Sequence, residues 1–286
     1  MRTKSMVLDL LVGGGTEIVE GTLRKGERIT LLPSSEVGGE AVEIYYLLSG
    51  SLAQLGAEET DIMVRGDYLV TRGLAEEAIF TAIEEVRFLY VTSQPFFKEI
   101  SSGLQELMQL AVEVELKDGY TAEHCLRLQR LSFATGKALG LSAHRLHLLD
   151  HGSYLHDVGK VRVPVEILLK PAALTDDEWA VIKLHPTFGR EMLQPTFVRE
   201  AGRIVEQHHE RLDGSGYPFG LAADEILPES YIVAIVDTYD AMTTDRAYRK
   251  ALPKAEAFDE LTRFSNIHYP RELVEAFLSV VHKLES

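Results

Sequence analysis

Residues suited to metal chemistry are concentrated in the C-terminal part of the sequence, because all ten histidines lie at or after position 124. Two of them, His208 and His209, are adjacent and open the segment HHERLDGSGYP, whose glycines let a ligand come close to the backbone. A third, His156, is followed directly by Asp157. Imidazole and carboxylate groups together are typical ligands of iron, manganese and zinc. Any imidazole-based metal site is therefore expected in this part of the chain.

Further candidate ligands are spread over several predicted helices. His124 lies on the helix before His156, and His185 follows a later helix in the segment KLHPTFG. Asp237 interrupts the apolar run YIVAIVDTYDAM, where an unpaired carboxylate is costly to bury, and Asp240 adds a second carboxylate one turn later. These residues, drawn from five helices, predict two adjoining sites with nitrogen and oxygen ligands and a carboxylate that bridges a pair of metals.

The segment HDVGK places a lysine beside a potential metal ligand. If these residues continue a helix, Lys160 lies four residues after His156 and three after Asp157, and shares their face. A protonated lysine cannot bind a metal, but it can donate a proton to a leaving oxygen. Taken alone, the segment is better explained as an ordinary polar helix end. The other candidate ligands shift the balance toward a catalytic role.

The elements that must position these residues are helical. Gly140 follows the first periodic stretch, Thr175 with two aspartates after it suggests a helix N-terminus, and prolines fall between the stretches. The sequence predicts an all-α domain over residues 119–286, with helices at 123–139, 146–158, from 175, and at 202–210, 230–244, 254–264 and 271–284.

Residues 1–97 have the pattern of short strands. β-rich runs cover residues 6–12, 43–48, 51–55, 68–70, 78–83 and 86–92, and glycine turns separate several of them. Many short strands without a helical period predict a small barrel or sandwich. The hairpin EIYYLLSGSL and the later RGD turn resemble cupin or cyclic-nucleotide-binding-like β-barrels, and this resemblance implies a small, cupin-like barrel. Because the segment has no histidine, the usual cupin metal site is absent, which leaves a sensory or a purely structural role.

Residues 98–118 predict a linker helix between the two domains. Its apolar residues follow spacings of three and four, the pattern of a coiled-coil seam, although the seam is under three heptads long. Two interpretations stay open, a helix packed against its own domains and a helix that forms a homodimer. The seam consists of Phe97, Ile100, Leu104, Leu107, Ala111 and Val114.

The order of the C-terminal motifs resembles that of the HD-GYP phosphodiesterases, a branch of the HD metal-phosphohydrolase superfamily. The resemblance covers roughly residues 119–280 and rests on five separated motifs. It implies a binuclear iron or manganese centre, with Asp157 bridging the two ions and Lys160 as proton donor. The implied metal ligands are His124, His156, Asp157, His185, His208, His209 and Asp237.

The resemblance also implies the substrate cyclic di-GMP, which is cleaved to linear pGpG and in some members on to GMP. Some members hold a third metal through a glutamate one helical turn before the first histidine, and here that position is Tyr120. Two ions, and not three, are therefore expected. The loop that contains Gly-Tyr-Pro could admit substrate or meet a partner such as a diguanylate cyclase.

Substrate contacts are expected beside the metal ligands. Arg246 and Arg249 follow Asp237 and could grip phosphates through bidentate hydrogen bonds, or else belong to a solvated helix face. Tyr217 could stack on a guanine or shape the pocket, with Gly216 beside it. We also expect Asp240 to contact the substrate.

Composition narrows the class of protein. The 286 residues carry a net charge of −15, which argues against a general DNA- or RNA-binding surface, because such surfaces are basic. Cys125 is the only cysteine, so an intrachain disulfide is excluded and a reducing cytoplasm is expected. No segment predicts a membrane span. Two rival functions remain, hydrolysis of another cyclic dinucleotide by the same fold, and a non-catalytic cyclic di-GMP receptor.

Overall fold

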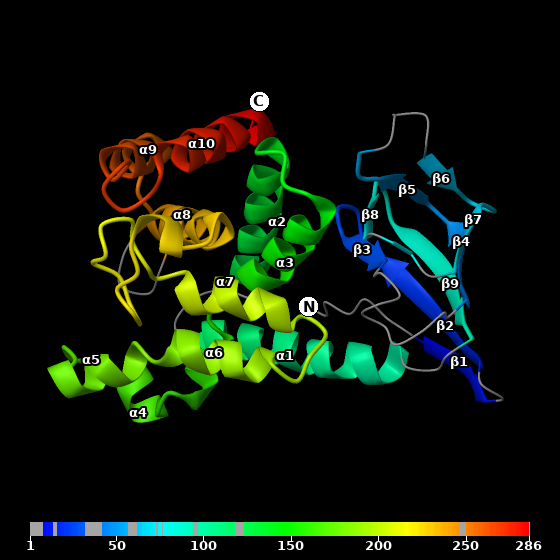
Figure 1. Ribbon diagram of the computed structural model, residues 1–286, viewed down its shortest axis with the longest axis horizontal. Helices are drawn as coiled ribbons and strands as arrows, with labels where there is room; N and C mark the ends of the chain where they lie inside the picture. The colour runs from blue at the N-terminus through cyan, green and yellow to red at the C-terminus, as the bar shows by residue number, and fades with distance from the viewer. Residues whose placement is uncertain are drawn as a thin grey trace. The chain divides into compact units, whose positions relative to one another are not determined.

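The chain divides into two compact units, Met1–Ser101 and Ser102–Ser286. We describe each unit by itself in a computed structural model (Figure 1). None of the described helices is long and apolar enough to cross a membrane. The structure describes residues 8–13, 16–31, 42–56, 62–72, 74–75, 77–93, 97–117, 123–245 and 250–285.

The N-terminal unit is built from two antiparallel sheets. A five-stranded sheet has the order β1-β2-β9-β4-β7, and a four-stranded sheet has the order β3-β8-β5-β6. The strands are β1 (Leu8–Gly13), β2 (Thr16–Leu23), β3 (Arg28–Leu31), β4 (Val42–Ser49), β5 (Ser51–Gln54), β6 (Ile62–Val64), β7 (Tyr68–Arg72), β8 (Ala78–Ala82) and β9 (Val86–Thr92).

Alternate residues of these strands form one apolar core shared by the two sheets. On β9, Val86, Phe88 and Tyr90 are buried while the residues between them are more exposed, as the two-residue period of a half-buried strand requires. Leu52 on β5 and Phe80 on β8 enter the same core from the other sheet. The prediction of an N-terminal β unit is confirmed. The described strands form a sandwich of two sheets, and a closed barrel is not shown.

The C-terminal unit is helical, as predicted. Its α-helices are α1 (Phe97–Lys117), which begins before the boundary, α2 (Glu123–Ala138), α3 (Ala143–Tyr154), α4 (Val165–Leu168), α5 (Asp176–Ile182), α6 (His185–Leu193), α7 (Gly202–Gln207), α8 (Pro228–Thr243), α9 (Lys254–Arg263) and α10 (Arg271–Glu285). Short 3₁₀-helices lie at η1 (Val158–Arg162), η2 (Arg199–Ala201) and η3 (Ala223–Glu225).

Helix α8 is the buried centre of this unit. It packs against α2, α9 and α10 (Figure 1), and Ile232, Val233, Ile235 and Val236 are at most 1% exposed. A helix that is apolar on nearly all sides is typical of such a central position. Asp237 comes directly after this run, so the apolar packing of α8 determines where its carboxylate lies.

The apolar seam of α1 packs inside the helical unit from residue 104 onward. Leu107 and Ala111 share a core cluster with Cys125 and Val158, and Leu104 packs against it. The homodimer interpretation of this seam therefore loses most of its apolar surface, because the chain's own core covers it. The side chains of Phe97 and Ile100 lie outside the described ones.

The HDVGK segment differs from its predicted helical conformation. Helix α3 ends at Tyr154, and His156 and Asp157 occupy the turn before η1. Lys160 still reaches Asp157, because residues three apart are eclipsed in a 3₁₀-helix. Packing explains why residue 159 is a glycine. A Cβ atom there would lie 2.0 Å from the carbonyl oxygen of His185, so only glycine lets η1 approach α6 this closely.

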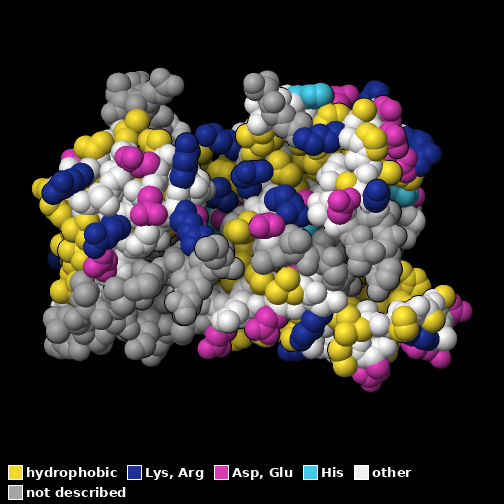
Figure 2. All heavy atoms as spheres, turned by 180° about the vertical axis from the view of Figure 1, so that it is seen from behind, with side chains coloured by type: hydrophobic (Ala, Val, Ile, Leu, Met, Phe, Trp, Pro, Cys, Tyr) yellow, Lys and Arg dark blue, Asp and Glu magenta, His cyan; other side chains and the backbone are white. Residues whose placement is uncertain are grey.

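The surface carries both charges. On the face seen in Figure 2, basic and acidic side chains are interspersed, with apolar side chains between them. This mixture differs from the continuous basic surface that polynucleotide-binding proteins use.

Candidate metal centre

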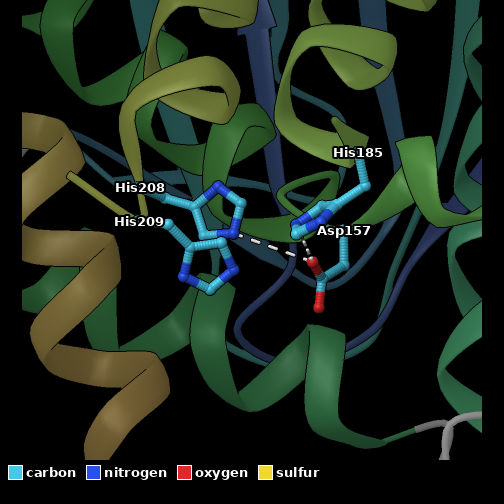
Figure 3. Close-up of side chains that lie close together, drawn as sticks. All are labelled: Asp157, His185, His208 and His209. Carbon is cyan, nitrogen blue, oxygen red and sulfur yellow. Dashed lines mark ion pairs between the residues drawn. The ribbon is translucent and has the colours of Figure 1, made fainter. Parts of the chain in front are cut away.

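Four predicted ligands meet at a first cluster, which consists of Asp157, His185, His208 and His209 (Figure 3). One potential ligand atom from each lies within 4.8 Å of the others. The Nε2 atoms of His185 and His208 lie 2.9 Å and 3.7 Å from Oδ1 of Asp157. The residues come from the turn before η1, the first residue of α6 and the end of α7. Packing of these three elements therefore creates the cluster.

Backbone hydrogen bonds set which ring nitrogen faces the first cluster. Nδ1 of His185 bonds to the carbonyl oxygen of Ile182 (2.8 Å), and Nδ1 of His208 to that of Val205 (2.6 Å). A carbonyl oxygen only accepts, so Nδ1 is the protonated nitrogen in each ring. In the neutral rings both Nε2 lone pairs then point at a carboxylate oxygen of Asp157. Acceptor atoms that face one another in a buried site need a cation between them, and a metal ion meets this need.

A second cluster adjoins the other oxygen of Asp157 and consists of Glu115, His124 and His156, all buried. One ligand atom of each lies within 4.8 Å of the others. Nε2 of His156 is 3.2 Å from Oδ2 of Asp157, whose Oδ1 faces the first cluster. Asp157 therefore presents one oxygen to each cluster, which is the arrangement a bridging ligand requires.

Asp237 stands at the edge of the second cluster. Its Oδ1 lies 3.9 Å from Nε2 of His124, and its side chain is 21% exposed. The structure thus brings six of the seven predicted metal ligands into these two adjoining clusters and places Asp237 beside the second.

Asp240 was predicted to contact the substrate, but the structure places it behind His124. It is 3% exposed, and its Oδ2 accepts a hydrogen bond from Nδ1 of His124 at 2.7 Å. Arg127 donates to both of its oxygens, at 2.6 Å and 2.9 Å. With both oxygens engaged, Asp240 orients the imidazole of His124 so that Nε2 faces the second cluster. A carboxylate behind a metal-binding histidine commonly has this role.

Replacing Asp240 with asparagine is expected to weaken metal binding at the second cluster by about 10- to 100-fold, because His124 loses its charged hydrogen-bond partner. A titration of the metal-free protein with Mn²⁺ measures this affinity. Asp177→Asn, at an exposed position on α5, is the matched control and is expected to bind as the wild type does. Unchanged Mn²⁺ affinity in Asp240→Asn would remove the orienting role.

Burial and neighbouring charges set the protonation states of these side chains. Burial lowers the pKa of His208 to about 4 and holds that of His209 well below its usual range, so both rings are neutral at pH 7. Burial opposes the charge of His156, but Asp157 outweighs it and raises the pKa of His156 to about 9. A metal ion that binds His156 therefore displaces a proton.

Lys160 lies directly beside the bridging carboxylate. Its Nζ is 2.7 Å from Oδ2 of Asp157, and its side chain is 11% exposed. Burial opposes ionisation of Asp157, but Lys160 and then His156 hold the pKa of its carboxyl well below the usual range. Lys160 and His156 together therefore favour the ionised form of Asp157, and Lys160 places an ammonium group at the edge of the cluster.

The loop of residues 208–218 is held against the first cluster. The ring of Tyr217 stacks on His209, with 4.5 Å between the ring centroids. A Cβ atom at Gly216 would lie 2.4 Å from Cα of Glu210, so this glycine allows the loop to pack on its own start. Gly216 therefore has a packing role in the loop, and Tyr217 is the side chain that reaches the site.

Two buried glutamates at this site escaped sequence reasoning. Glu210 is 0% exposed and accepts hydrogen bonds from the backbone of Phe219 (2.8 Å) and Leu221 (3.0 Å), which ties down the loop. Glu115 is 1% exposed at the second cluster, where burial, followed by Asp157, raises its pKa to about 7. The seam carries no signal for Glu115, because the residue after Val114 corresponds to an e position of the heptad, where glutamate is common.

Three predicted positions lie outside the described residues. Arg246 and Arg249 fall within residues 246–249, and Tyr120 falls within residues 118–122. Their predicted roles therefore stay predictions.

The sequence around this site is similar to a known protein family and to several characterised proteins. The HD domain family matches residues 105–273, which is more than half of the chain and includes both clusters. A cyclic di-GMP phosphodiesterase of Thermotoga maritima is 37% identical over 193 residues, which cover 66% of this chain and 52% of that protein. The 3'3'-cGAMP-specific phosphodiesterase 1 of Vibrio cholerae is 32% identical over 257 residues, which cover 80% and 57%.

One solved structure adds support for the fold alone. The crystal structure of a cyclic GMP-AMP specific phosphodiesterase of V. cholerae aligns with a TM-score of 0.51 at 17% identity, over 63% of this chain and 48% of that one. The chain spans about half the length of the curated relatives described above.

Proposed function

This chain belongs to the HD domain family, and from that premise we propose that it is a metal-dependent phosphodiesterase that hydrolyses cyclic di-GMP to linear pGpG. One observation carries the proposal, the convergence of two imidazole Nε2 atoms on Oδ1 of Asp157 while its Oδ2 adjoins the second cluster. A pair of adjoining cation sites around one carboxylate suits phosphoryl transfer. The named activity of the T. maritima relative supports the choice of cyclic di-GMP.

The residues present fit two ions, for which we propose iron or manganese. The first cluster offers three imidazoles and one carboxylate oxygen, and the second offers imidazoles, carboxylates and the other oxygen of Asp157. Mixed nitrogen and oxygen donors suit these metals. When bound, such ions activate water at neutral pH and neutralise charge that develops on phosphoryl oxygens.

Lys160 is proposed to protonate the departing 3′ oxygen of the substrate. Its ammonium group lies 2.7 Å from Oδ2 of Asp157, so it is held beside the clusters where the phosphodiester is proposed to bind. Tyr217, stacked on His209, is proposed to bound the substrate pocket and offers a ring face to a guanine. Arg246 and Arg249 are proposed as phosphate contacts on their residue type alone.

The N-terminal unit is proposed to regulate the enzyme as a cupin-like sensory domain. Its double-sheet core is compatible with that family, and no described histidine lies in it to support a cupin metal site. The position of this unit before α1 in the chain suits a regulatory input.

A second candidate substrate, 3'3'-cGAMP, follows from the named activity of the V. cholerae relative. Assaying the Mn²⁺-loaded and the Fe²⁺-loaded chain with each cyclic dinucleotide, with chromatography of the products, separates the candidates. Cyclic di-GMP is expected to react at least about tenfold faster. Faster cleavage of 3'3'-cGAMP would transfer the assignment to that substrate. Binding of cyclic di-GMP without turnover by the metal-loaded chain would instead indicate a receptor.

A further inference from the structure

Glu115 is a buried acidic side chain near the end of α1. Its side chain is 1% exposed, and within residues 97–117, 123–245 and 250–285 neither of its carboxylate oxygens has a hydrogen-bond partner. The neighbouring seam residues Leu107, Ala111 and Val114 are buried and apolar. A carboxylate in such surroundings is destabilising unless a cation or hydrogen-bond donors compensate it. In the functional protein, a cation or hydrogen-bond donors must therefore compensate the buried carboxylate of Glu115.

Two imidazoles face this carboxylate. Nε2 of His124 lies 3.6 Å from Oε2 of Glu115, and His156 brings a ring nitrogen within 4.8 Å of both. Asp240 holds Nδ1 of His124 at 2.7 Å, so the other ring nitrogen is turned toward Glu115. Donor atoms from α1, from α2 and from the turn after α3 converge on one buried point. Such convergence of a carboxylate and two imidazoles is the donor set of a transition-metal site.

We propose that Glu115 is a metal ligand that α1 contributes to the second cluster, where it holds a divalent transition metal ion together with His124 and His156. The inference rests on the proposed metal-dependent function and deepens it by one ligand. The tyrosine at position 120 predicted two metal ions instead of three, and that prediction concerned a third ion and not the second cluster.

The position of Glu115 links metal binding to the helix that follows the N-terminal unit. Helix α1 begins at Phe97, and the last strand of that unit, β9, ends at Thr92. A helix transmits a shift or a turn along its length because its backbone hydrogen bonds keep it stiff. A shift of α1 relative to α2 and to the turn after α3 would therefore change the distance between Glu115 and the other residues of the second cluster.

Metal binding by variants of the full chain tests the ligand. We would titrate the metal-free wild type, Glu115→Gln and Glu115→Asp with Mn²⁺, and separately with Fe²⁺ without oxygen, and measure the ions retained after desalting. Glu113→Gln is the matched control, because Glu113 lies two residues away on the same helix and is exposed. Glu115→Gln is expected to bind one ion at least about tenfold more weakly, and Glu115→Asp, with a shorter reach, also more weakly than the wild type.

Thermal unfolding gives a readout that does not depend on activity. In EDTA, Glu115→Gln is expected to unfold at the wild-type temperature or above it, because the neutral amide removes a buried charge. Added Mn²⁺ is expected to stabilise Glu115→Gln less than it stabilises the wild type. Equal Mn²⁺ and Fe²⁺ affinities, with equal stabilisation, in the wild type and both variants would overturn the inference. So would a wild type that binds neither metal.

The same measurements separate this inference from the proposed function. Metal content and unfolding temperature are measured without any nucleotide. A wild type that fails to cleave cyclic di-GMP, but whose metal binding depends on Glu115, would refute the function and leave the ligand assignment in place. If the wild type cleaves cyclic di-GMP but Glu115→Gln retains every ion at full affinity, the ligand assignment is refuted and the proposed function stays in place.

Discussion

Replacing Asp157 with asparagine is expected to remove metal binding from both clusters and to lower hydrolysis of cyclic di-GMP by about three orders of magnitude, roughly 4 kcal/mol of transition-state stabilisation. The reason is geometric. One oxygen of Asp157 lies 2.9 Å from Nε2 of His185 in the first cluster, and the other lies 3.2 Å from Nε2 of His156 in the second. Asparagine has nearly the same shape but has no charge, and its amide nitrogen cannot bind a cation. Metal content after desalting and initial rates of pGpG release measure the two effects.

The matched control is Asp224→Asn, which changes an exposed aspartate on η3 and is expected to keep both metal and activity. Circular dichroism checks that the Asp157→Asn protein is folded, since the change leaves Lys160 and His156 without their shared partner. A folded Asp157→Asn protein that keeps the wild-type complement of ions would contradict the bridging role. Loss of only one ion would restrict Asp157 to a single cluster.

Replacing Lys160 with methionine is expected to keep the metal ions and to lower turnover of cyclic di-GMP by about 10²- to 10⁴-fold, the usual contribution of a general acid. Methionine fills much of the same space without a proton to donate. Nζ of Lys160 lies 2.7 Å from Asp157, so the lysine is close to the site, yet a protonated amine cannot be a ligand. Single-turnover rates and metal content, measured on one preparation, separate chemistry from metal loading.

A substrate with a good leaving group gives this test its sharpest form. Bis(4-nitrophenyl) phosphate releases a phenolate that needs no proton, so its hydrolysis should be much less sensitive to Lys160→Met than that of cyclic di-GMP. Lys137→Met, at an exposed position near the end of α2, is the control for loss of a positive charge. If Lys160→Met loses its metal, the lysine acts by keeping Asp157 ionised. An equal loss of rate on both substrates would also argue against proton donation.

Local sequence signals predicted most of the elements well. Thr175 caps α5 with a full capping box, in which its hydroxyl and the side chain of Glu178 each accept a hydrogen bond from the other's backbone. The apolar run around residue 235 predicted a buried helix, and α8 is one. These signals succeed because caps and periodicity depend on residues within a few turns of one another.

Predictions that depended on long-range packing were less secure. The HDVGK segment was expected on a helix, but α3 ends at Tyr154 because η1 docks on α6 through the gap that Gly159 leaves. Helix α6, which begins at His185, was not predicted as an element. The closed barrel expected for the N-terminal unit is not shown, since strand alternation alone does not decide between a barrel and two packed sheets.

The sequence by itself determined the chemistry that is available, because a side chain carries its donor atoms and its charge wherever it lies. Seven candidate histidine and aspartate ligands, together with Lys160, could be named in order from their motifs. The tertiary structure alone decided how the carboxylates are used. Asp240 was predicted to contact the substrate, but in the structure it accepts a hydrogen bond from His124. Glu115 lies in a cluster whose other members are nine and 41 residues further along the chain. Contacts across such separations depend on how helices pack, and no short-range pattern records that packing.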